Sequence, residues 1–160
     1  MRRSPAHRSL TGLGILCLLA FGCAHDSYQQ RAGIVKNHVE AFYTHLKANR
    51  VEPAIHENEQ IEAMAAQMAE TVRTQAQRKG TSQVEREFAL MQTANETAAQ
   101  NWLALGQYFA IKKHYAQARA TYQRILATYT KTADQSFRDQ ALRALKDLDI
   151  MAPPADKSTP

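Results

Sequence analysis

Hydrophobic residues recur at steps of three and four along most of this chain, which is the spacing of an amphipathic α-helix. The first predicted helix covers residues 32–49, and its apolar stripe consists of Val35, Val39, Phe42 and Leu46. The second covers residues 53–78, because Pro53 cannot continue a helix interior but suits the first turn of a new helix. The folded part of the chain is therefore expected to begin with a pair of helices.

Three more helices are predicted after this pair. The third begins at Ser82 and carries the longest stripe, which consists of Val84, Phe88, Met91, Asn95, Ala98, Trp102, Leu105 and Phe109. No Pro or Gly interrupts this stripe before Gly106, which favours one continuous helix over a helix that bends near Asn95. The fourth and fifth helices cover residues 115–130 and 134–150. No segment has the alternation of a strand, so the predicted fold class is all-α, with about five helices in antiparallel hairpins.

The N-terminal segment has a different pattern. Its basic residues come first and are Arg2, Arg3 and Arg8. They precede an apolar stretch, residues 10–21, which has the size of a secretory signal core and is too short to remain as a helix across a bilayer of about 30 Å. Gly22 and Cys23 follow directly. This arrangement resembles the lipobox of exported bacterial lipoproteins, in which a small residue precedes a lipidated cysteine.

The resemblance implies that residues 1–22 are a signal peptide and that Cys23 is lipidated and becomes the first residue of the mature chain. Several acyl chains on one cysteine give durable anchoring, since each buried methylene contributes about 0.8 kcal/mol. The expected location is the bacterial cell envelope, at the outer membrane and facing the periplasm. The alternative is ordinary signal cleavage after Ala20-Phe21-Gly22, which would release a soluble protein.

Removal of the signal peptide changes the composition in two ways. The net charge falls from +5 to +2, because three arginines and no acidic residue are lost, and nucleic-acid binding then loses its main support. Cys17 is lost as well, so no disulfide is expected in the mature chain. The polar residues 23–31 are predicted to form a flexible tether, residues 32–151 one all-α domain, and residues 152–160 a disordered tail.

A second motif spans residues 99–129. Its spacing, Trp-x-x-Leu-Gly-x-x-Phe followed by Ala-x-x-x-Tyr, is formed by Trp102, Leu105, Gly106, Phe109, Ala118 and Tyr122. This spacing resembles the tetratricopeptide repeat, a pair of helices of about 34 residues. We expect Gly106 and Ala118 to let the two helices approach closely and Tyr122 to close the gap between them. An ordinary helical bundle, in which Trp102 and Gly106 meet at a helix crossing, is the alternative.

The repeat family implies a concave, partner-binding surface on the first helix of the unit. The corresponding positions in this chain are Gln100, Leu103, Gln107, Ile111 and Lys112. Their amide and aliphatic side chains could bind a peptide backbone and apolar side chains, and Lys112 could attract acidic groups. The last helix is expected to cap the array, with a charged outer side that consists of Arg138, Asp139, Arg143, Lys146 and Asp147.

No catalytic or cofactor motif is present in the sequence. It contains neither a glycine-rich phosphate loop nor a Gly-x-Ser-x-Gly elbow, and the only thiol of the mature chain is the expected lipidation site. The carboxylates Glu57, Glu59, Glu62 and Glu70 are predicted on a solvated helix face. We therefore expect no enzymatic activity, no catalytic residue and no cofactor.

His38 and His45 lie seven residues apart, about 10 Å along one helix face, which is too far to chelate one ion without further ligands. Such ligands would have to come from a neighbouring helix, from residues such as Glu62 or Glu70, and no metal site is expected.

The leading hypothesis from the sequence is a membrane-anchored, non-enzymatic helical adaptor that binds another envelope protein or a peptide. The first alternative is a periplasmic bundle of four or five helices that senses metal or stress through His38, His45 and nearby carboxylates. The second is a self-assembling scaffold, because the heptad-like stripe from Val84 to Phe109 could pair between two copies.

Overall fold

The computed structural model describes residues 23–75 and 81–152, and within them it contains helices and no strand. The elements are α1 (Cys23–Lys47), α2 (Val51–Gln75), α3 (Thr81–Ile111), α4 (Tyr115–Thr128), a short 3-10 helix η1 (Thr132–Asp134) and α5 (Gln135–Met151). The predicted all-α class with about five helices is confirmed. The prediction that the third helix is continuous is confirmed as well, since α3 runs for 31 residues without a break.

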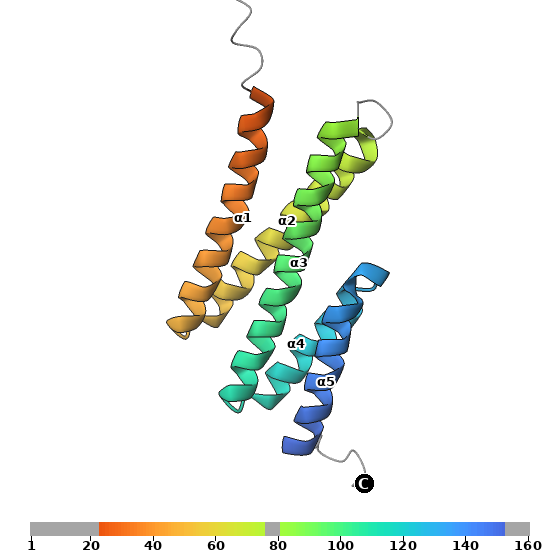
Figure 1. Ribbon diagram of the computed structural model, residues 1–160. Helices are drawn as coiled ribbons and strands as arrows, with labels where there is room; N and C mark the ends of the chain where they lie inside the picture. The colour runs from red at the N-terminus through yellow and green to blue at the C-terminus, as the bar shows by residue number, and fades with distance from the viewer. Residues whose placement is uncertain (1–22, 76–80, 153–160) are drawn as a thin grey trace, which may run out of the picture.

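The helices form two layers. In Figure 1, α1, α3 and α5 lie in front, and α2 and α4 lie behind them. Each helix packs against the next one along the chain, and α3 also contacts α1 and α5. No helix in the described ranges has both the length and the apolar character needed to span a membrane.

The first helix starts earlier than the sequence predicted. Residues 23–31, expected to form a flexible tether, belong to α1, which corrects that expectation. Two contacts hold this part of α1 on the rest of the fold: Tyr28 packs against a hydrophobic cluster, and Arg31 pairs with the carboxylate of the buried Glu87 in α3. The predicted signal peptide and residues 153–160 of the predicted tail lie outside the described residues.

The hydrophobic interior consists of two clusters. One joins the N-terminal halves of α1 and α3 to α2, and its buried members are Val35, Ile61, Ala65, Met68, Leu90, Ala94 and Ala98. The larger one joins the C-terminal half of α3 to α4 and α5 and to the adjoining ends of α1 and α2, with Phe42, Trp102, Leu105, Phe109, Ile125 and Leu148 among its members. Among the described elements, α3 contributes several buried residues to each cluster. Helices α1 and α2 each contribute only one buried residue to one of the two clusters.

The stripe predicted along α3 is correct only in its C-terminal part. From Ala98 to Phe109 its members are buried, but Phe88 has 45% of its surface exposed. Leu90 and Ala94 are buried instead in the N-terminal part of α3. The buried face differs along the helix because α2 covers the N-terminal part, whereas α4 and α5 cover the C-terminal part.

Two hairpin turns use the same backbone motif. Asn49 and Lys113 have positive φ angles of 56° and 62° and follow the ends of α1 and α3. In the second turn the His114 N–H donates to the Phe109 carbonyl at 2.8 Å, and the Lys113 N–H donates to the Ala110 carbonyl at 3.0 Å. This is the Schellman arrangement, whose left-handed position favours Gly or Asn.

Candidate functional site

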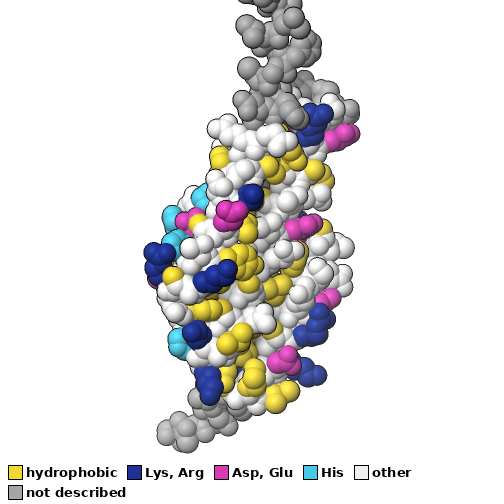
Figure 2. Space-filling model, turned by 60° about the vertical axis from the view of Figure 1, so that its left-hand side comes forward, with side chains coloured by type: hydrophobic (Ala, Val, Ile, Leu, Met, Phe, Trp, Pro, Cys, Tyr) yellow, Lys and Arg dark blue, Asp and Glu magenta, His cyan; other side chains and the backbone are white. Residues whose placement is uncertain are grey.

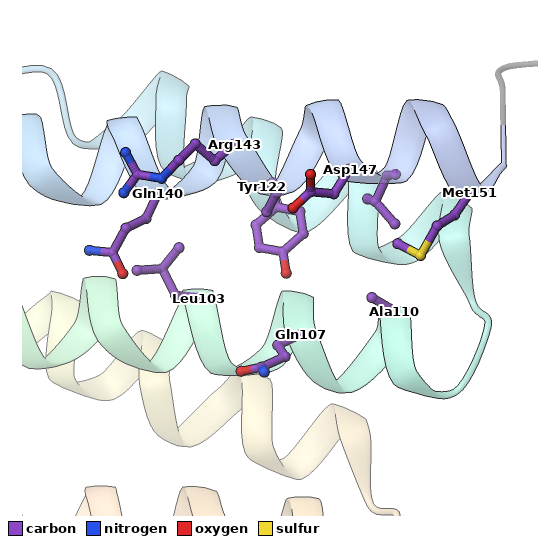
Figure 3. A pocket seen from close by; sticks show the side chains of 10 residues that line it. Leu103, Gln107, Ala110, Tyr122, Gln140, Arg143, Asp147 and Met151 are labelled. Atoms are coloured by element: carbon purple, nitrogen blue, oxygen red, sulfur yellow. The ribbon is translucent and has the colours of Figure 1, made fainter.

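A groove of about 490 Å³ lies between the C-terminal half of α3 and helix α5, with α4 behind it. Its lining consists of Leu103, Gln107, Ala110, Tyr122, Gln140, Arg143, Ala144, Asp147, Leu148 and Met151. Figure 3 shows the α3 side chains facing those of α5, with Leu103 opposite Gln140 and Ala110 opposite Met151. We call this hollow the α3–α5 groove.

The Tyr122 ring separates the two walls of the groove. It projects from α4 into the space between α3 and α5 (Figure 3), and only 5% of the residue is exposed. A Cβ atom added to Gly106 would lie 2.5 Å from Tyr122 Cε1, so the ring occupies the space that any larger residue at position 106 would need. Tyr122 thus fills the space beside Gly106, in agreement with its expected place in the gap between α3 and α4.

Polar groups of both signs line the groove. Arg143 and Asp147 are exposed on α5, and the amides of Gln107 and Gln140 lie on opposite walls. Burial, together with the negative charge of Asp147, raises the pKa of Tyr122 above its ordinary value, so its hydroxyl remains a hydrogen-bond donor at neutral pH. A groove with a donor, a cation, a carboxylate and two amides beside aliphatic walls is suited to a peptide rather than to a wholly apolar ligand.

The residues predicted to bind a partner do not all lie in the groove. Leu103 and Gln107 line it. Gln100 is exposed on α3 but is not part of the lining, and Ile111 is 71% exposed at the end of that helix. Lys112 lies beyond the groove, with its Nζ atom 5.7 Å from the centre of the Tyr108 ring.

The opposite wall of the groove was missed from the sequence. Arg143 and Asp147 were assigned to the outer side of a capping helix, whereas they line the groove. The stripe of α5 gave a partial signal, since Ala141, Leu145 and Leu148 mark its inner face and Ala144 lies beside them. Periodicity could not show that the edge of this face borders a hollow rather than open solvent.

A polar network between α2, α3 and α4 was also missed. Glu62 of α2 accepts hydrogen bonds from Trp102 Nε1 at 2.7 Å, from the Tyr129 hydroxyl at 2.8 Å and from Arg124 at 2.9 Å. The guanidinium of Arg124 also stacks 4.0 Å from the centre of the Trp102 ring and donates to Glu59. Glu62 and Glu59 therefore do not lie on a purely solvated face as expected, but join α2 to α3 and α4.

The two histidines of α1 share one partner. His38 Nδ1 lies 2.6 Å from Glu57 Oε2, and His45 Nε2 lies 4.0 Å from Glu57 Oε1. The neighbouring carboxylates named from the sequence lie elsewhere: Glu62 belongs to the network above, and Glu70 pairs with Arg73. Across residues 23–75 and 81–152 no group of three or more His, Cys, Asp or Glu residues is placed to hold a metal ion.

A second hollow of about 500 Å³ lies between α2, α3 and η1. Its apolar wall is formed by Ala65, Ala66, Ala69, Phe88 and Met91. Its polar rim includes Asn95, which donates to Asp134 Oδ1 at 3.2 Å. The exposed surface of Phe88 thus borders a hollow, and none of the predicted partner-binding residues lies there.

Comparison with protein-family models, with curated proteins and with solved structures finds no match for this chain.

Proposed function

We propose that this chain is a membrane-anchored, non-enzymatic adaptor of the bacterial cell envelope that binds an extended segment of another protein in the α3–α5 groove. The observation that carries the proposal is the groove itself, which has a volume of about 490 Å³. Leu103 and Gln107 on its α3 wall face Arg143 and Asp147 on its α5 wall. Mixed polar and aliphatic linings of this kind bind peptides through backbone hydrogen bonds and side-chain contacts. The tetratricopeptide-like spacing in the sequence supports the same surface, because that family uses the first helix of each repeat for binding.

Two further observations concern the groups that lie outside the groove. The partly buried carboxylates Glu57 and Glu62 already have partners from other helices, so neither is positioned as an unpaired acid or base. The histidine and acidic side chains of the described ranges form no metal-binding group. The groove therefore remains the feature on which this proposal depends.

The groove is tested by selecting linear peptides from a displayed library against the full chain. Peptides that bind the groove should bind the Gln107→Ala and Arg143→Glu variants at least about tenfold more weakly than the original chain, because each variant removes a central polar contact. The matched control is Gln123→Ala, an exposed glutamine of α4 that lies outside the groove lining. Selected peptides that bind all three variants as they bind the original chain would contradict the groove assignment.

The anchor is tested separately by the intact mass of the protein purified from a bacterial membrane. The proposal expects a chain that begins at Cys23 and carries acyl groups, and expects Cys23→Ser to carry none. A mature chain that begins at Cys23 without lipid, or acyl groups retained by Cys23→Ser, would contradict anchoring. Neither result would alter the groove experiment.

A second candidate function is the sensing of protons or metal ions through His38 and His45. The observation in its favour is that Glu57 lies within 4.0 Å of both imidazoles, which links α1 to α2 through side chains of the kinds that bind metal ions. If zinc binds there, the melting temperature should rise with zinc concentration, and His38→Gln should abolish the rise. An unchanged melting temperature would remove the metal form of this candidate.

A further inference from the structure

One end of the molecule combines exposed cations with exposed aliphatic side chains. The α1–α2 turn, the α3–α4 turn and the C-terminus of α5 all lie at the lower end in Figure 1, opposite the start of α1. The exposed residues there include Lys47, Arg50, Ile111, Lys112, Lys113 and Met151. We call this surface the basic tip.

Contacts within the fold show that the basic tip is continuous. The Tyr108 hydroxyl donates to Asn49 Oδ1 at 2.9 Å, which joins the α1–α2 turn to the last turns of α3. The Lys112 ammonium lies 5.7 Å from the centre of the same Tyr108 ring. Ala110 and Met151 line the same end of the α3–α5 groove, which brings the end of α5 beside the end of α3.

The cations of the basic tip have no acidic partner. Lys47, Arg50, Lys112 and Lys113 form no ion pair with any described residue, whereas cations elsewhere, such as Arg73 and Arg119, do. The nearby carboxylates do not cancel this charge. Asp149 is paired with Arg119, and the exposed carboxylates Glu52 and Asp147 are two negative charges against the four cations. The tip is therefore a surface of net positive charge.

Two details are not required by the fold. Lys113 occupies a left-handed position, φ 62°, where Gly or Asn would be less strained, so a lysine there has no structural advantage. Ile111 is 71% exposed and Met151 is 57% exposed, although most large aliphatic side chains among the described residues are buried or half-buried. Figure 2 shows Lys and Arg side chains beside hydrophobic ones in the lower part of the face that it displays.

We propose that the basic tip docks on the surface of an anionic phospholipid bilayer. The lysines and Arg50 contact lipid phosphates, and Ile111 and Met151 enter the headgroup region. Charge complementarity selects an anionic surface, and the exposed aliphatic residues favour a bilayer over an acidic protein, since they gain contact with acyl chains. The tip lies apart from the proposed lipidation site, because Cys23 begins α1 at the opposite end of the domain, but it shares Met151 with the α3–α5 groove.

Flotation of the full chain with phosphatidylcholine vesicles, with and without phosphatidylglycerol, tests the proposal. The double variant Lys112→Glu with Lys113→Glu should bind anionic vesicles at least about tenfold more weakly, because each basic residue near the surface contributes substantially to binding. The matched control reverses the same number of charges away from the tip, with Lys36→Glu and Arg86→Glu, and should change binding by about twofold or less at physiological salt. Both pairs of residues are exposed, and circular dichroism would check that each variant keeps its helices.

A local probe keeps the test decisive even if residues 1–22 bind vesicles on their own. The variant Ile111→Trp should show a blue-shifted emission that is quenched by brominated anionic lipids. Phe88→Trp, at the other end of α3, should show neither effect, and the native Trp102 is 2% exposed and therefore shielded from the quencher.

Three results would overturn the proposal. One is equal loss of vesicle binding in the tip variant and in the control variant. Another is a tryptophan at position 111 that lipid does not quench. The third is binding of poly-glutamate with no preference for anionic over neutral vesicles, which would assign the tip to an acidic protein instead.

Discussion

Gly106 shows how a single residue sets the distance between two helices. An alanine in the middle of a helix is ordinarily more stable than a glycine by up to about 1 kcal/mol, so a glycine inside α3 has a local cost. In this fold the missing side chain makes room for the Tyr122 ring, three of whose atoms would lie within 3 Å of a Cβ at position 106. The same ring divides the α3–α5 groove, so the glycine also helps to shape the candidate site.

Gly106→Ala should therefore destabilise the protein, although helix propensity alone predicts the opposite. We expect a net loss of about 1 to 2 kcal/mol, because forcing extra volume into a packed contact costs about 1 to 3 kcal/mol and exceeds the gain in propensity. Gly33→Ala is the matched control, since nothing lies within 4 Å of the added Cβ, and it should leave stability unchanged or raise it by up to about 1 kcal/mol. Urea unfolding followed by helical signal measures both; equal stabilisation by the two alanines would refute the contact.

At the scale of helices, α3 is the element that unites the fold. Its N-terminal part packs with α1 and α2, its C-terminal part packs with α4 and α5, and the two hydrophobic clusters meet along it. Polar contacts reinforce these crossings: Asn101 donates to Asn58 Oδ1 at 2.9 Å inside the α2–α3 interface, and Asn58 donates to the Ala98 carbonyl at 3.1 Å. The Glu62 carboxylate adds a link from α2 to both α3 and α4.

Removing the Glu62 carboxylate should weaken the packing of α2 against both α3 and α4. In Glu62→Ala the indole N–H of Trp102, the Tyr129 hydroxyl and Arg124 would lose one acceptor, and we expect a loss of about 2 to 3 kcal/mol, since unsatisfied buried donors are costly. Trp102 fluorescence during urea unfolding would report the loss, because the change occurs at that side chain. Glu70→Ala is the control: its carboxylate pairs only with Arg73 on the same exposed helix face, and its removal should not shift the unfolding midpoint.

At the scale of the whole molecule, two tyrosines make folding sensitive to alkaline pH. Burial, the charge of Glu62 and the hydrogen bond donated to Glu62 raise the pKa of Tyr129 far above its ordinary value, and burial also raises the pKa of Tyr122. In the unfolded chain both phenols ionise near pH 10, whereas in the folded chain they ionise only at a higher pH. The unfolded state therefore releases protons that the folded state retains, and stability that is fully present below about pH 10 is lost as the pH rises further.

Between pH 9 and pH 11, the melting temperature of the original protein should thus fall more steeply than that of a variant that lacks one of these phenols. Each protonated tyrosine contributes a slope of up to about 1.4 kcal/mol per pH unit above pH 10, and Tyr129→Phe should remove one such contribution. Tyr43→Phe, at an exposed position, should leave the slope unchanged. The comparison uses slopes rather than absolute stabilities, because Tyr129→Phe also removes a hydrogen bond to Glu62. Identical slopes in all three proteins would contradict this account.

The sequence was sufficient for the helices because a helix is a local structure. Stripes such as Val35 to Leu46 and Pro53 at the start of the second helix depend on residues within a few turns, and the predicted bounds of α4 and α5 lie within two residues of those in the structure. The close approach at Gly106 was also predictable, because a glycine and a tyrosine at repeat-like spacing face each other across one short turn. Leu103 and Gln107 entered the candidate site through the same spacing.

Other features depend on which helices pack together, and the spacing of hydrophobic residues within one segment does not contain that information. Residues 23–31 read as a polar tether, but they are helical, with Tyr28 and Arg31 in contact with other parts of the fold. Glu62 was predicted on a solvated face, yet it joins three helices. Arg143 and Asp147 were predicted on the outer side of a capping helix, yet they line a groove. Periodicity predicted the helices from residue 32 onward, and the repeat-like spacing supplied two residues of one groove wall. The packing of α2, α4 and α5 around α3 decided the rest, because burial and charge pairing arise between helices rather than within them.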